Sequence, residues 1–498
     1  MEKTRVVLDP SYKIAEVDPR IFGGFLEHMG RAVYEGVYDP QSSYADENGF
    51  RKDVLAALRR LQLTTMRYPG GNFASGYHWK DGIGPKNKRP VVRDLAWQSI
   101  EPNQFGTDEF MTLAHLMNWM PMITVNLGTG TPEEARNWVE YCNSPVGTKF
   151  SNMRASNSTK EPYGVKLWCL GNEIDGLWQL GHLPADKYAI LAQQAAKLMK
   201  DTDPSIETIA CGSCSIDLPT YMDWDRTVLE YVGSFADYVS LHRYVENSKG
   251  NTSDYLAVTN SIDQQIEEMD AVCRFVQAKS RSKKRHYLCF DEWNVWYRTI
   301  DAESSNGRGK FAPPISEEHY NLEDALVVAG FLNSFIRHAD SVKIANIAQI
   351  VNVIAPIRTR GNDLLLQSTY YPFAMFATRR QGVSILPVID GPLYESPSYG
   401  TTNFIDASAI LGNARLHTFL INRSISEIAE IEIDHASGKI QSVISAEMVS
   451  GLDPNVSNSF GNHNIICNQP LSTVTVVNGK ASVQLPPLSF GAITFEVT

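Results

Sequence analysis

The feature that most constrains the fold is a series of eight short apolar runs, each separated from the next by helix-like or loop segments. Runs such as Val165-Lys-Leu-Trp-Cys-Leu170 are largely apolar on both faces, as parallel strands covered by helices must be. The pattern predicts a (β/α)8 barrel. Its strands are expected at residues 21–27, 64–70, 122–127, 165–170, 208–214, 238–244, 287–291 and 345–353.

The segments between these runs have the periodicity of amphipathic helices. They cover residues 51–63, 107–117, 132–142, 185–199, 261–280 and 316–338. Thr107 and Ser316 are predicted as N-caps, because acidic residues follow each of them in the first turn. A doubly wound open sheet is the alternative fold, but no glycine-rich dinucleotide motif follows the first strand.

The sequence pattern changes after about Gln381. Short, β-branched, alternating segments follow, with Asn, Gly, Ser and Pro between them, and they predict an all-β, jelly-roll-like sandwich. Residues 5–10 are also strand-like and precede the first barrel strand. We therefore expect residues 1–17 to join the sandwich, residues 18–381 to form the barrel and any catalytic site, and residues 382–498 to form the sandwich.

Charge and cysteine content narrow the possible partners and the compartment. The net charge of −11 should repel phosphate backbones and anionic lipids, so nucleic-acid and membrane partners are disfavoured. The start of the chain lacks the apolar stretch of a secretory signal. An odd number of cysteines, seven, is scattered along the chain, which agrees with a reducing compartment. A cytoplasmic location is expected.

Polar side chains follow the predicted strands, where a barrel places its working residues. The expected site is rich in neutral hydrogen-bonding groups and in aromatic residues, including Trp178, Trp293, Trp296 and Tyr244. This mixture suits sugar hydroxyls and ring faces, whereas phosphate would require more cations. We expect the polar set to encircle one cavity; it comprises Glu27, His28, Arg67, Asn72, Asn126, Asn172, Glu173, His242, Arg243, Tyr244, Asp291, Glu292, Gln349 and Asn352.

Glu173 and Glu292 stand out because each lies at the end of a buried strand, beside Asn or Asp. Hydrolysis of a glycosidic bond needs one carboxyl group to protonate the leaving oxygen and a second to attack or stabilise the anomeric carbon. A structural carboxylate is the alternative for Glu173 alone. Strand alternation turns Asp291 away from Glu292, so Asp291 is expected to support neighbouring loops.

For several other residues, a structural role is the simpler interpretation. His28, His242 and His319 suggest a metal cluster, yet no metal-ligand spacing occurs, and satisfied histidines near the site are favoured. Trp79, Trp97 and Trp119 are expected in the core or at the rim. The Gly70-Gly71 pair is expected to let the backbone approach a ligand and to direct Asn72.

Five motifs, in this order, resemble those of the intracellular α-L-arabinofuranosidases of glycoside hydrolase family 51. They are Phe22-Gly-Gly-Phe-Leu-Glu27-His, Arg67-Tyr-Pro-Gly-Gly-Asn72-Phe, Trp168-Cys-Leu-Gly-Asn-Glu173-Ile-Asp-Gly, Asp291-Glu-Trp-Asn-Val-Trp296 and Gln349-Ile-Val-Asn-Val-Ile-Ala-Pro-Ile. The likeness runs from the first strand to the end of the barrel, with the weaker β-rich tail also present. Ile174 and Leu177 depart from the family pattern, where many members have Met and Pro, and they bear on fine specificity.

The resemblance implies Glu173 as general acid/base, Glu292 as nucleophile and Asn172 as the partner of the sugar hydroxyl next to the reacting carbon. It also implies sugar binding by Glu27, Arg67, Asn72, Tyr244 and Gln349, with Trp178 and Trp296 shaping the pocket. No metal, nucleotide or flavin is expected. Family members are commonly hexamers, so a homo-oligomer is expected as well.

These observations predict retaining, exo-acting hydrolysis of terminal α-L-arabinofuranosyl residues from arabino-oligosaccharides, arabinoxylan and arabinan fragments. The mechanism requires Glu173 to be protonated, so we expect burial and the charge of Glu292 to raise its pKa. A related barrel enzyme acting on β-xylosides or β-glucans is the alternative. A non-catalytic carbohydrate-binding protein is the second alternative, and a metal-dependent barrel hydrolase a third. Linkage preference is expected to depend on the loops at residues 177–183 and 296–311.

Overall fold

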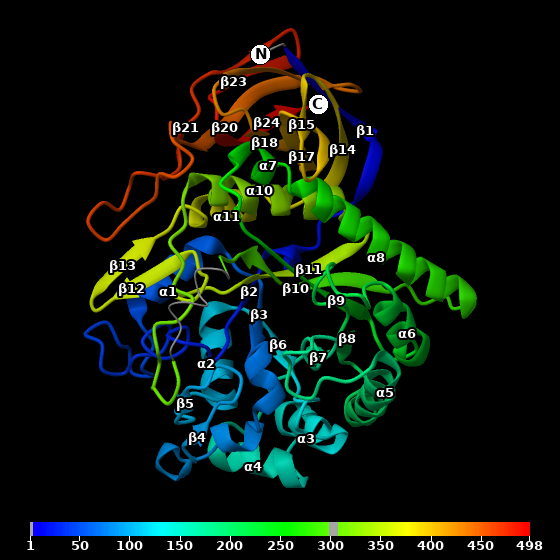
Figure 1. Cartoon of the computed structure of the whole chain (residues 1–498), viewed down its shortest axis with the longest axis vertical. Helices are drawn as coiled ribbons and strands as arrows, with labels where there is room; N and C mark the ends of the chain where they lie inside the picture. The colour runs from blue at the N-terminus through cyan, green and yellow to red at the C-terminus, as the bar shows by residue number, and fades with distance from the viewer. Residues whose placement is uncertain (1–2, 298–306) are drawn as a thin grey trace.

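The computed structural model describes residues 3–297 and 307–498, which form a closed barrel and a β-sheet domain (Figure 1). The barrel strands follow the order β10-β11-β2-β3-β6-β7-β8-β9, and every neighbouring pair is parallel. The predicted barrel is confirmed, and each predicted run overlaps one strand. The strands are β2 (Gly23–Phe25), β3 (Thr65–Tyr68), β6 (Met120–Thr124), β7 (Leu167–Leu170), β8 (Glu207–Ala210), β9 (Tyr238–Val245), β10 (Tyr287–Val295) and β11 (Val342–Ala348).

The six predicted helices are present with ends shifted by a few residues: α1 (Lys52–Leu61), α2 (Thr107–Met117), α3 (Pro132–Asn143), α5 (Ala185–Thr202), α8 (Thr259–Lys279) and α10 (Leu322–Arg337). Among the described residues, four further helices were not predicted: α4 (Lys149–Asn157), α6 (Asp223–Val232), α7 (Thr252–Leu256) and α11 (Tyr370–Ala377). Short 3-10 turns also occur, at η1 (Pro19–Phe22), η2 (Asn72–Gly76), η3 (Trp79–Gly82) and η4 (Lys86–Lys88).

Both predicted N-caps are wrong. Helix α10 begins after Asn321, whose side chain accepts a hydrogen bond from the backbone N–H of Asp324. Ser316 lies several residues earlier, with a φ of 51° that does not suit the extended backbone of an N-cap. Helix α2 begins at Thr107 itself, and the Glu109 carboxylate accepts from the Gly106 N–H at 2.9 Å.

The second domain is built on one ten-stranded sheet, with the order β21-β20-β24-β18-β17-β14-β1-β19-β23-β22. The sheet curls so that side chains from both halves, such as Val6, Leu420, Ile431 and Phe495, share one core. The predicted sandwich-type domain is confirmed. Its strands are β1 (Thr4–Glu16), β14 (Val383–Asp390), β17 (Ile405–Gly412), β18 (Arg415–Asn422), β19 (Ala429–His435), β20 (Ile440–Ser450), β21 (Gln469–Pro470), β22 (Val474–Val477), β23 (Lys480–Leu485) and β24 (Ser489–Val497).

The amino-terminal strand β1 lies inside this sheet, antiparallel to β14 and parallel to β19. Three small hairpins complete the strands: β4 (Val92–Arg93) with β5 (Ile100–Glu101), β12 (Ile357–Arg360) with β13 (Asp363–Leu366), and β15 (Leu393–Ser396) with β16 (Gly400–Asn403). The two ends of the chain therefore meet in one sheet, since β1 pairs with β14 and β19, which follow it by at least 367 residues (Glu16 to Val383).

Helices α10 and α11 lie between the barrel and the sheet domain (Figure 1). Phe376 of α11 stacks on Phe419 and Phe490 of the sheet, with ring centroids 4.1 and 5.0 Å apart. Arg337 of α10 donates a 2.9 Å hydrogen bond to Asp406. Because these contacts are buried and partly aromatic, we expect them to hold the two domains in a fixed relation.

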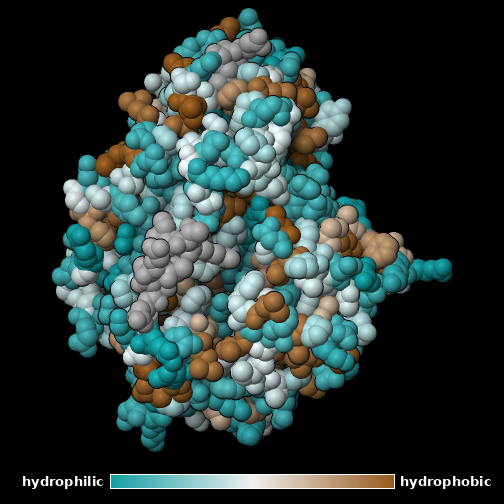
Figure 2. All heavy atoms as spheres, in the orientation of Figure 1, coloured by the Kyte–Doolittle hydropathy of each residue, from teal (hydrophilic) through white to brown (hydrophobic). Residues whose placement is uncertain are grey.

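The face shown in Figure 2 is mostly hydrophilic, with apolar side chains gathered only in small separate patches. Within the described residues, no helix combines the length and the apolar character that crossing a bilayer requires.

Candidate active site

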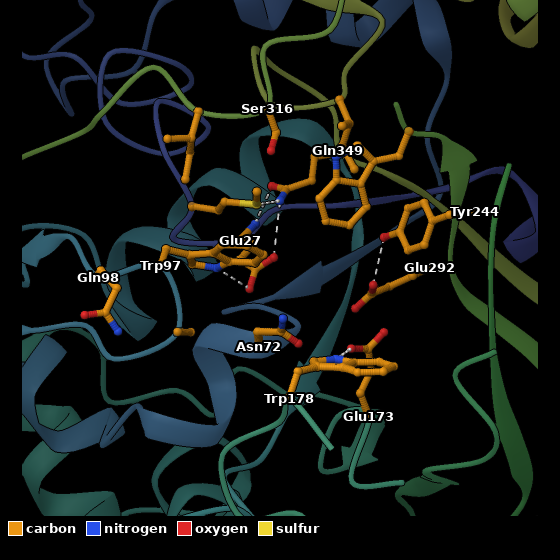
Figure 3. A pocket seen from close by; sticks show the side chains of 15 residues that line it. Glu27, Asn72, Trp97, Gln98, Glu173, Trp178, Tyr244, Glu292, Ser316 and Gln349 are labelled. Carbon is orange, nitrogen blue, oxygen red and sulfur yellow. Dashed lines mark hydrogen bonds between the residues drawn. The ribbon is translucent and has the colours of Figure 1, made fainter. Parts of the chain in front are cut away.

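A cavity of about 450 Å³ opens at the carboxyl ends of the barrel strands (Figure 3). Eight of the ten residues expected at the site line it: Glu27, Asn72, Glu173, Trp178, Tyr244, Glu292, Trp296 and Gln349. The other two, Arg67 and Asn172, lie buried directly beneath these side chains and bind them. The structure therefore gathers these ten residues around one hollow.

Glu173 and Glu292 face each other across the cavity (Figure 3). Glu173 follows β7 in a tight turn with positive φ at Gly171 (93°) and at Glu173 (46°), which directs its side chain into the barrel mouth. Glu292 lies within β10. One carboxylate oxygen of each, together with a ring nitrogen of His242, lie within 4.8 Å of one another. This spacing fits the roughly 5 to 5.5 Å between carboxyl groups that a covalent glycosyl-enzyme intermediate requires.

Glu292 is held by charged and neutral donors. Arg67, fully buried, donates from Nη1 to Glu292 Oε1 at 2.7 Å, and the Tyr244 hydroxyl donates to Oε2 at 2.8 Å. Charge-assisted bonds of this kind stabilise the ionised carboxylate and fix its orientation. Glu292 is therefore held by Arg67 and Tyr244 with its carboxyl group at the cavity.

Glu173 has different surroundings. The indole N–H of Trp178 donates to its Oε2 at 2.7 Å, and His242 Nδ1 lies 2.9 Å from its Oε1. Its side chain is buried. The two glutamates thus differ in their partners: an arginine holds Glu292 directly, whereas an indole contacts Glu173. Such a difference separates the roles of paired carboxyl groups in glycosidases.

His242 connects the two glutamates. Its Nδ1 lies 2.9 Å from Glu173 and 3.4 Å from Glu292, and its Nε2 lies 3.3 Å from Asp291. Burial alone would lower the pKa of His242, but the charges of Glu292 and Asp291 outweigh it and raise the pKa well above the usual range. A protonated ring then balances the carboxylates around it.

The three histidines considered as a metal cluster lie in different places. His28 contacts Glu101 and Tyr68, and His319 contacts Ser457, each with a hydrogen-bonding distance near 3 Å. Glu173, His242 and Glu292 are close enough together to hold an ion. Their closeness is also what the two-carboxylate chemistry requires, because both carboxyl groups must reach one anomeric carbon.

The expectation for Asp291 is wrong. Asp291 accepts from the Ser240 hydroxyl, and its Oδ2 lies 3.2 Å from Arg67 Nε, so it supports the same cluster as Glu292. The pairing of β10 with β9 shifts register between Cys289 and Glu292, and this irregularity breaks the simple alternation. Burial opposes ionisation of Asp291, but Arg67 and His242 outweigh it and hold its pKa below the usual value.

Glu27 lies on the side of the catalytic pair opposite to Tyr244 (Figure 3). Its carboxylate accepts from the backbone N–H of Phe73 at 2.9 Å and from Trp97 Nε1 at 3.1 Å, and Gln349 Nε2 lies 3.3 Å away. Burial and the nearby charge of Glu292 raise the pKa of Glu27 to about 8. A neutral Glu27 at lower pH can donate a hydrogen bond to a sugar hydroxyl as well as accept one.

Trp97 was expected in the core or at the rim, and the structure places it, partly buried, at the mouth of the barrel. It lines the cavity and contacts Glu27. The loop that carries it is fixed by Asp94, which accepts from the backbone N–H groups of Ala96 and Trp97. Its position shortly after the second barrel strand was the available signal, since loops after barrel strands reach the mouth.

The side chains of Asn172 and Asn72 are oriented by hydrogen bonds that start from Arg67. Arg67 Nη2 donates to Asn172 Oδ1 at 2.7 Å, which fixes the flip of that amide. Asn172 Nδ2 in turn donates to Asn72 Oδ1 at 3.2 Å. The single guanidinium of Arg67 therefore sets the positions of Glu292, Asn172 and, through Asn172, Asn72.

Several residues expected around the cavity lie elsewhere. Asn126 accepts from three backbone N–H groups of its own loop, Gly128 to Gly130. Asn352 binds Thr359 and the backbone of Arg31. His28 lies behind the cavity, stacked on Phe73 at 4.8 Å. These residues follow barrel strands, as expected of residues at the site, but their side chains contact neighbouring loops and do not line the cavity.

We expect Gly71→Ala to impair turnover strongly. A Cβ at Gly71 would lie 2.5 Å from Glu292 Oε1, so the carboxylate must move. A misplacement near 1 Å typically costs about 100-fold in rate. Steady-state kinetics should show this loss in kcat, whereas Gly76→Ala, whose Cβ would meet only a Leu180 methyl at 3.3 Å, should retain most activity. Equal activity of both variants would contradict the packing described here.

Glu27 should make stability depend on pH. Because its pKa rises from 4.5 in the unfolded chain to about 8, the folded protein keeps a proton that the unfolded chain loses in this window. Its contribution to the free energy of unfolding therefore falls as pH rises from 4.5 to 8. Melting temperatures of the natural protein minus those of Glu27→Gln should decrease across this range. A difference in melting temperature that stays constant across this pH range would refute the raised pKa of Glu27.

The barrel, its paired carboxylates and the surrounding amides and aromatics define a glycoside hydrolase. Two family models match the chain: "Alpha-L-arabinofuranosidase 1 domain" over residues 57–265 and "Alpha-L-arabinofuranosidase C-terminal domain" over residues 291–489. The chain belongs to the α-L-arabinofuranosidases of glycoside hydrolase family 51, as its motifs predicted.

Individual relatives agree with this placement. An intracellular exo-α-(1→5)-L-arabinofuranosidase of Bacillus subtilis is 43% identical over 499 residues, covering 100% of this chain and 99% of the relative. A family 51 α-L-arabinofuranosidase structure from Bifidobacterium longum superposes with a TM-score of 0.95 at 34% identity, covering 99% of both chains. An arabinose complex of the Thermotoga maritima α-L-arabinofuranosidase gives a TM-score of 0.88 at 31% identity, again covering 99% of both chains.

Proposed function

We propose that this protein removes terminal, non-reducing α-L-arabinofuranosyl residues by double displacement, with Glu292 as the nucleophile and Glu173 as the general acid/base. The observation that carries the proposal is the approach of the two carboxyl groups within a cavity that ends at Glu27. A separation of this size favours retention over inversion, because inverting enzymes leave room for a water molecule between wider carboxyl groups.

In the first step, Glu292 attacks the anomeric carbon and forms a glycosyl ester while Glu173 gives its proton to the leaving oxygen. The charge on Glu292 disappears, so Glu173, now ionised, can accept a proton from water. That water attacks the anomeric carbon, the ester breaks, and both carboxyl groups return to their starting states. Arg67 and Tyr244 hold Glu292 for the attack.

Exo action is supported by the shape of the cavity. Glu27, Gln349 and Trp97 close one end and bind one another, so a chain cannot continue past them. A terminal sugar would place its hydroxyls against Glu27, Asn72 and Asn172 and its reacting carbon between Glu173 and Glu292. The cavity of about 450 Å³ suits a single pentosyl unit with part of its leaving group.

Comparison of 4-nitrophenyl α-L-arabinofuranoside with the corresponding β-xyloside and β-glucoside tests the substrate. We expect the arabinofuranoside to have the largest kcat/KM. A larger value for either other glycoside would defeat the substrate assignment and favour the related barrel glycosidases. Full activity after exhaustive chelation would exclude a metal-dependent barrel hydrolase.

The natural substrates proposed are arabino-oligosaccharides and arabinoxylan or arabinan fragments small enough to enter such a cavity. A cytoplasmic location is proposed because relatives such as that of Bacillus subtilis are named as intracellular enzymes.

A homohexamer is also proposed, and gel filtration with light scattering tests it. We further propose the division into residues 1–17 and 382–498 for the sheet domain and 18–381 for the catalytic barrel, which limited proteolysis would test.

A further inference from the structure

A second hollow, of about 700 Å³, lies beside the catalytic cavity. The two share a wall, because Tyr244 and Trp296 line both of them. These two rings pack edge to face, with centroids 5.1 Å apart. The rest of the second hollow comes from the loop after β8, the end of β9, the start of α8 and the turn between β15 and β16, and includes Asp217, Arg243, Glu246, Asn260, Gln264 and Tyr399.

The position of the second hollow relates it to the leaving group. Glu27, Asn72 and Gln349 gather at one side of the catalytic pair, whereas Tyr244 lies at the other side (Figure 3). A sugar held by Glu27 and its neighbours must extend its leaving group away from them. The wall formed by Tyr244 and Trp296 therefore lies where the second sugar of a substrate emerges.

Arg243 is the unusual group in this hollow. Its side chain is buried, with only 8% exposed, and Nη2 donates to the Ser261 hydroxyl at 2.6 Å. Its buried Nε has no hydrogen-bond partner. Among the described residues, no carboxylate oxygen lies within 4 Å of this guanidinium. The buried Arg67 has such partners in Asp291 and Glu292. Arg154, also buried, has no carboxylate partner, but its guanidinium donates to four backbone carbonyls.

A buried cation with no carboxylate in direct contact is costly, and an anionic ligand can offset that cost. Burial lowers the pKa of Arg243, and the charge of Asp217, which acts in the opposite direction, offsets this only in part. Asp217 and Glu246 also line the hollow, but Asp217 is exposed to solvent and neither contacts Arg243 within 4 Å. The exposed Asp217 carboxylate can accept hydroxyl donors. The hollow thus offers one site for a carboxylate and others for hydroxyl groups.

We propose that the second hollow is a leaving-group subsite for a uronic acid, whose carboxylate binds Arg243 and whose hydroxyls face Asp217. This inference rests on the proposed hydrolysis of arabinofuranosides. The substrate class it adds is an arabinofuranosyl unit attached to an acidic sugar. Trp296 and Tyr399 provide aromatic surface for the ring of that sugar.

The test uses two synthetic substrates that differ in one group: an arabinofuranosyl-glucuronic acid methyl glycoside, and the same compound with its carboxyl group reduced to hydroxymethyl. For the natural protein, kcat/KM for the acidic substrate should exceed that for the reduced one by about tenfold, as a charge-assisted hydrogen bond predicts. The difference should lie in KM. Equal values, or preference for the reduced compound, would overturn the inference without requiring any variant.

Arg243→Gln removes the charge and keeps a hydrogen-bond donor. The ratio of kcat/KM between the two substrates should fall to about one in this variant, whereas Arg274→Gln, at an exposed arginine of α8, should keep the ratio of the natural protein. An unchanged ratio in Arg243→Gln would refute the role of Arg243. Inhibition by inorganic phosphate as strong as that by methyl glucuronide would overturn the assignment to a uronic acid.

Hydrolysis of 4-nitrophenyl α-L-arabinofuranoside separates the two proposals, because its leaving group carries no carboxylate. No turnover of this compound by the natural protein would reject the proposed function itself. Turnover of it without any difference between the acidic and reduced substrates would reject only the uronic-acid subsite.

Discussion

Replacement of Glu292 by Ala should reduce turnover of aryl arabinofuranosides by at least about 10⁴-fold, because removal of a covalent nucleophile costs rate on this scale. Arg67 and Tyr244 would then face an empty space in place of their acceptor. The melting temperature should change far less than the rate. Initial rates with 4-nitrophenyl α-L-arabinofuranoside and thermal unfolding of the same preparations measure the two effects.

Azide gives a stricter form of this experiment. A small anion can occupy the space left in Glu292→Ala and attack the anomeric carbon directly, which yields the glycosyl azide of inverted configuration. Glu230→Ala, at a surface carboxylate paired with Lys279, serves as the matched control and should keep full activity. Near-normal hydrolysis by Glu292→Ala would remove the proposed nucleophile from the mechanism.

Replacement of Glu173 by Ala should have an effect that depends on the leaving group. Oligosaccharides, whose leaving oxygen needs a proton, should react about 10³-fold or more slowly, in line with the usual contribution of general acid catalysis. A dinitrophenyl leaving group needs no proton, so formation of the ester should remain fast with such a substrate. Hydrolysis of the ester should then limit the rate, because no base activates water.

Azide again distinguishes the roles. In Glu173→Ala it should attack the ester on Glu292 and yield the glycosyl azide of retained configuration, opposite to the product of Glu292→Ala. Nuclear magnetic resonance of the two products gives both configurations. Identical configurations from the two variants, or equal losses for good and poor leaving groups in Glu173→Ala, would show that the roles are wrongly assigned.

The barrel could be predicted from sequence because each of its strands is short, apolar and followed by polar residues, as at Leu167–Leu170 and the turn that ends in Glu173. The site followed from the same rule, since strand ends in a barrel converge on one mouth. The ten-stranded sheet was predictable as a domain but its order was not. Pairing of β1 with β14 and β19 joins distant segments, and no local pattern encodes such partners.

Failures of sequence reasoning have identifiable causes. Asp291 was assigned to the wrong side because the register shift in β10 is a property of the pairing with β9. The contact of Trp97 with Glu27 was not predicted, because the loop of Trp97 is positioned by Asp94 and by contacts with Gly309 and Lys310, which lie far away in sequence. His242 was expected near the site, but its contact with both glutamates depends on barrel geometry. Part of the 296–311 loop lies outside the described residues.

The raised pKa expected for Glu173 remains a prediction. Its partners, Trp178 and His242, are known from the structure, yet the proton balance among Glu173, His242 and Glu292 is shared by the group. The pH dependence of kcat/KM therefore reports the cluster as a unit. Loss of the alkaline limb in Glu173→Ala, with an activated substrate, would assign that limb to Glu173.

Mass spectrometry of a trapped intermediate tests the central claim most directly. Glu173→Ala, mixed with a dinitrophenyl arabinofuranoside and quenched in acid, should gain the mass of one pentosyl unit, and peptide mapping should place it on Glu292. An adduct on Asp291 or on another residue would contradict the account. So would its complete absence together with a product of inverted configuration, because the two carboxyl groups would then not act through a covalent ester.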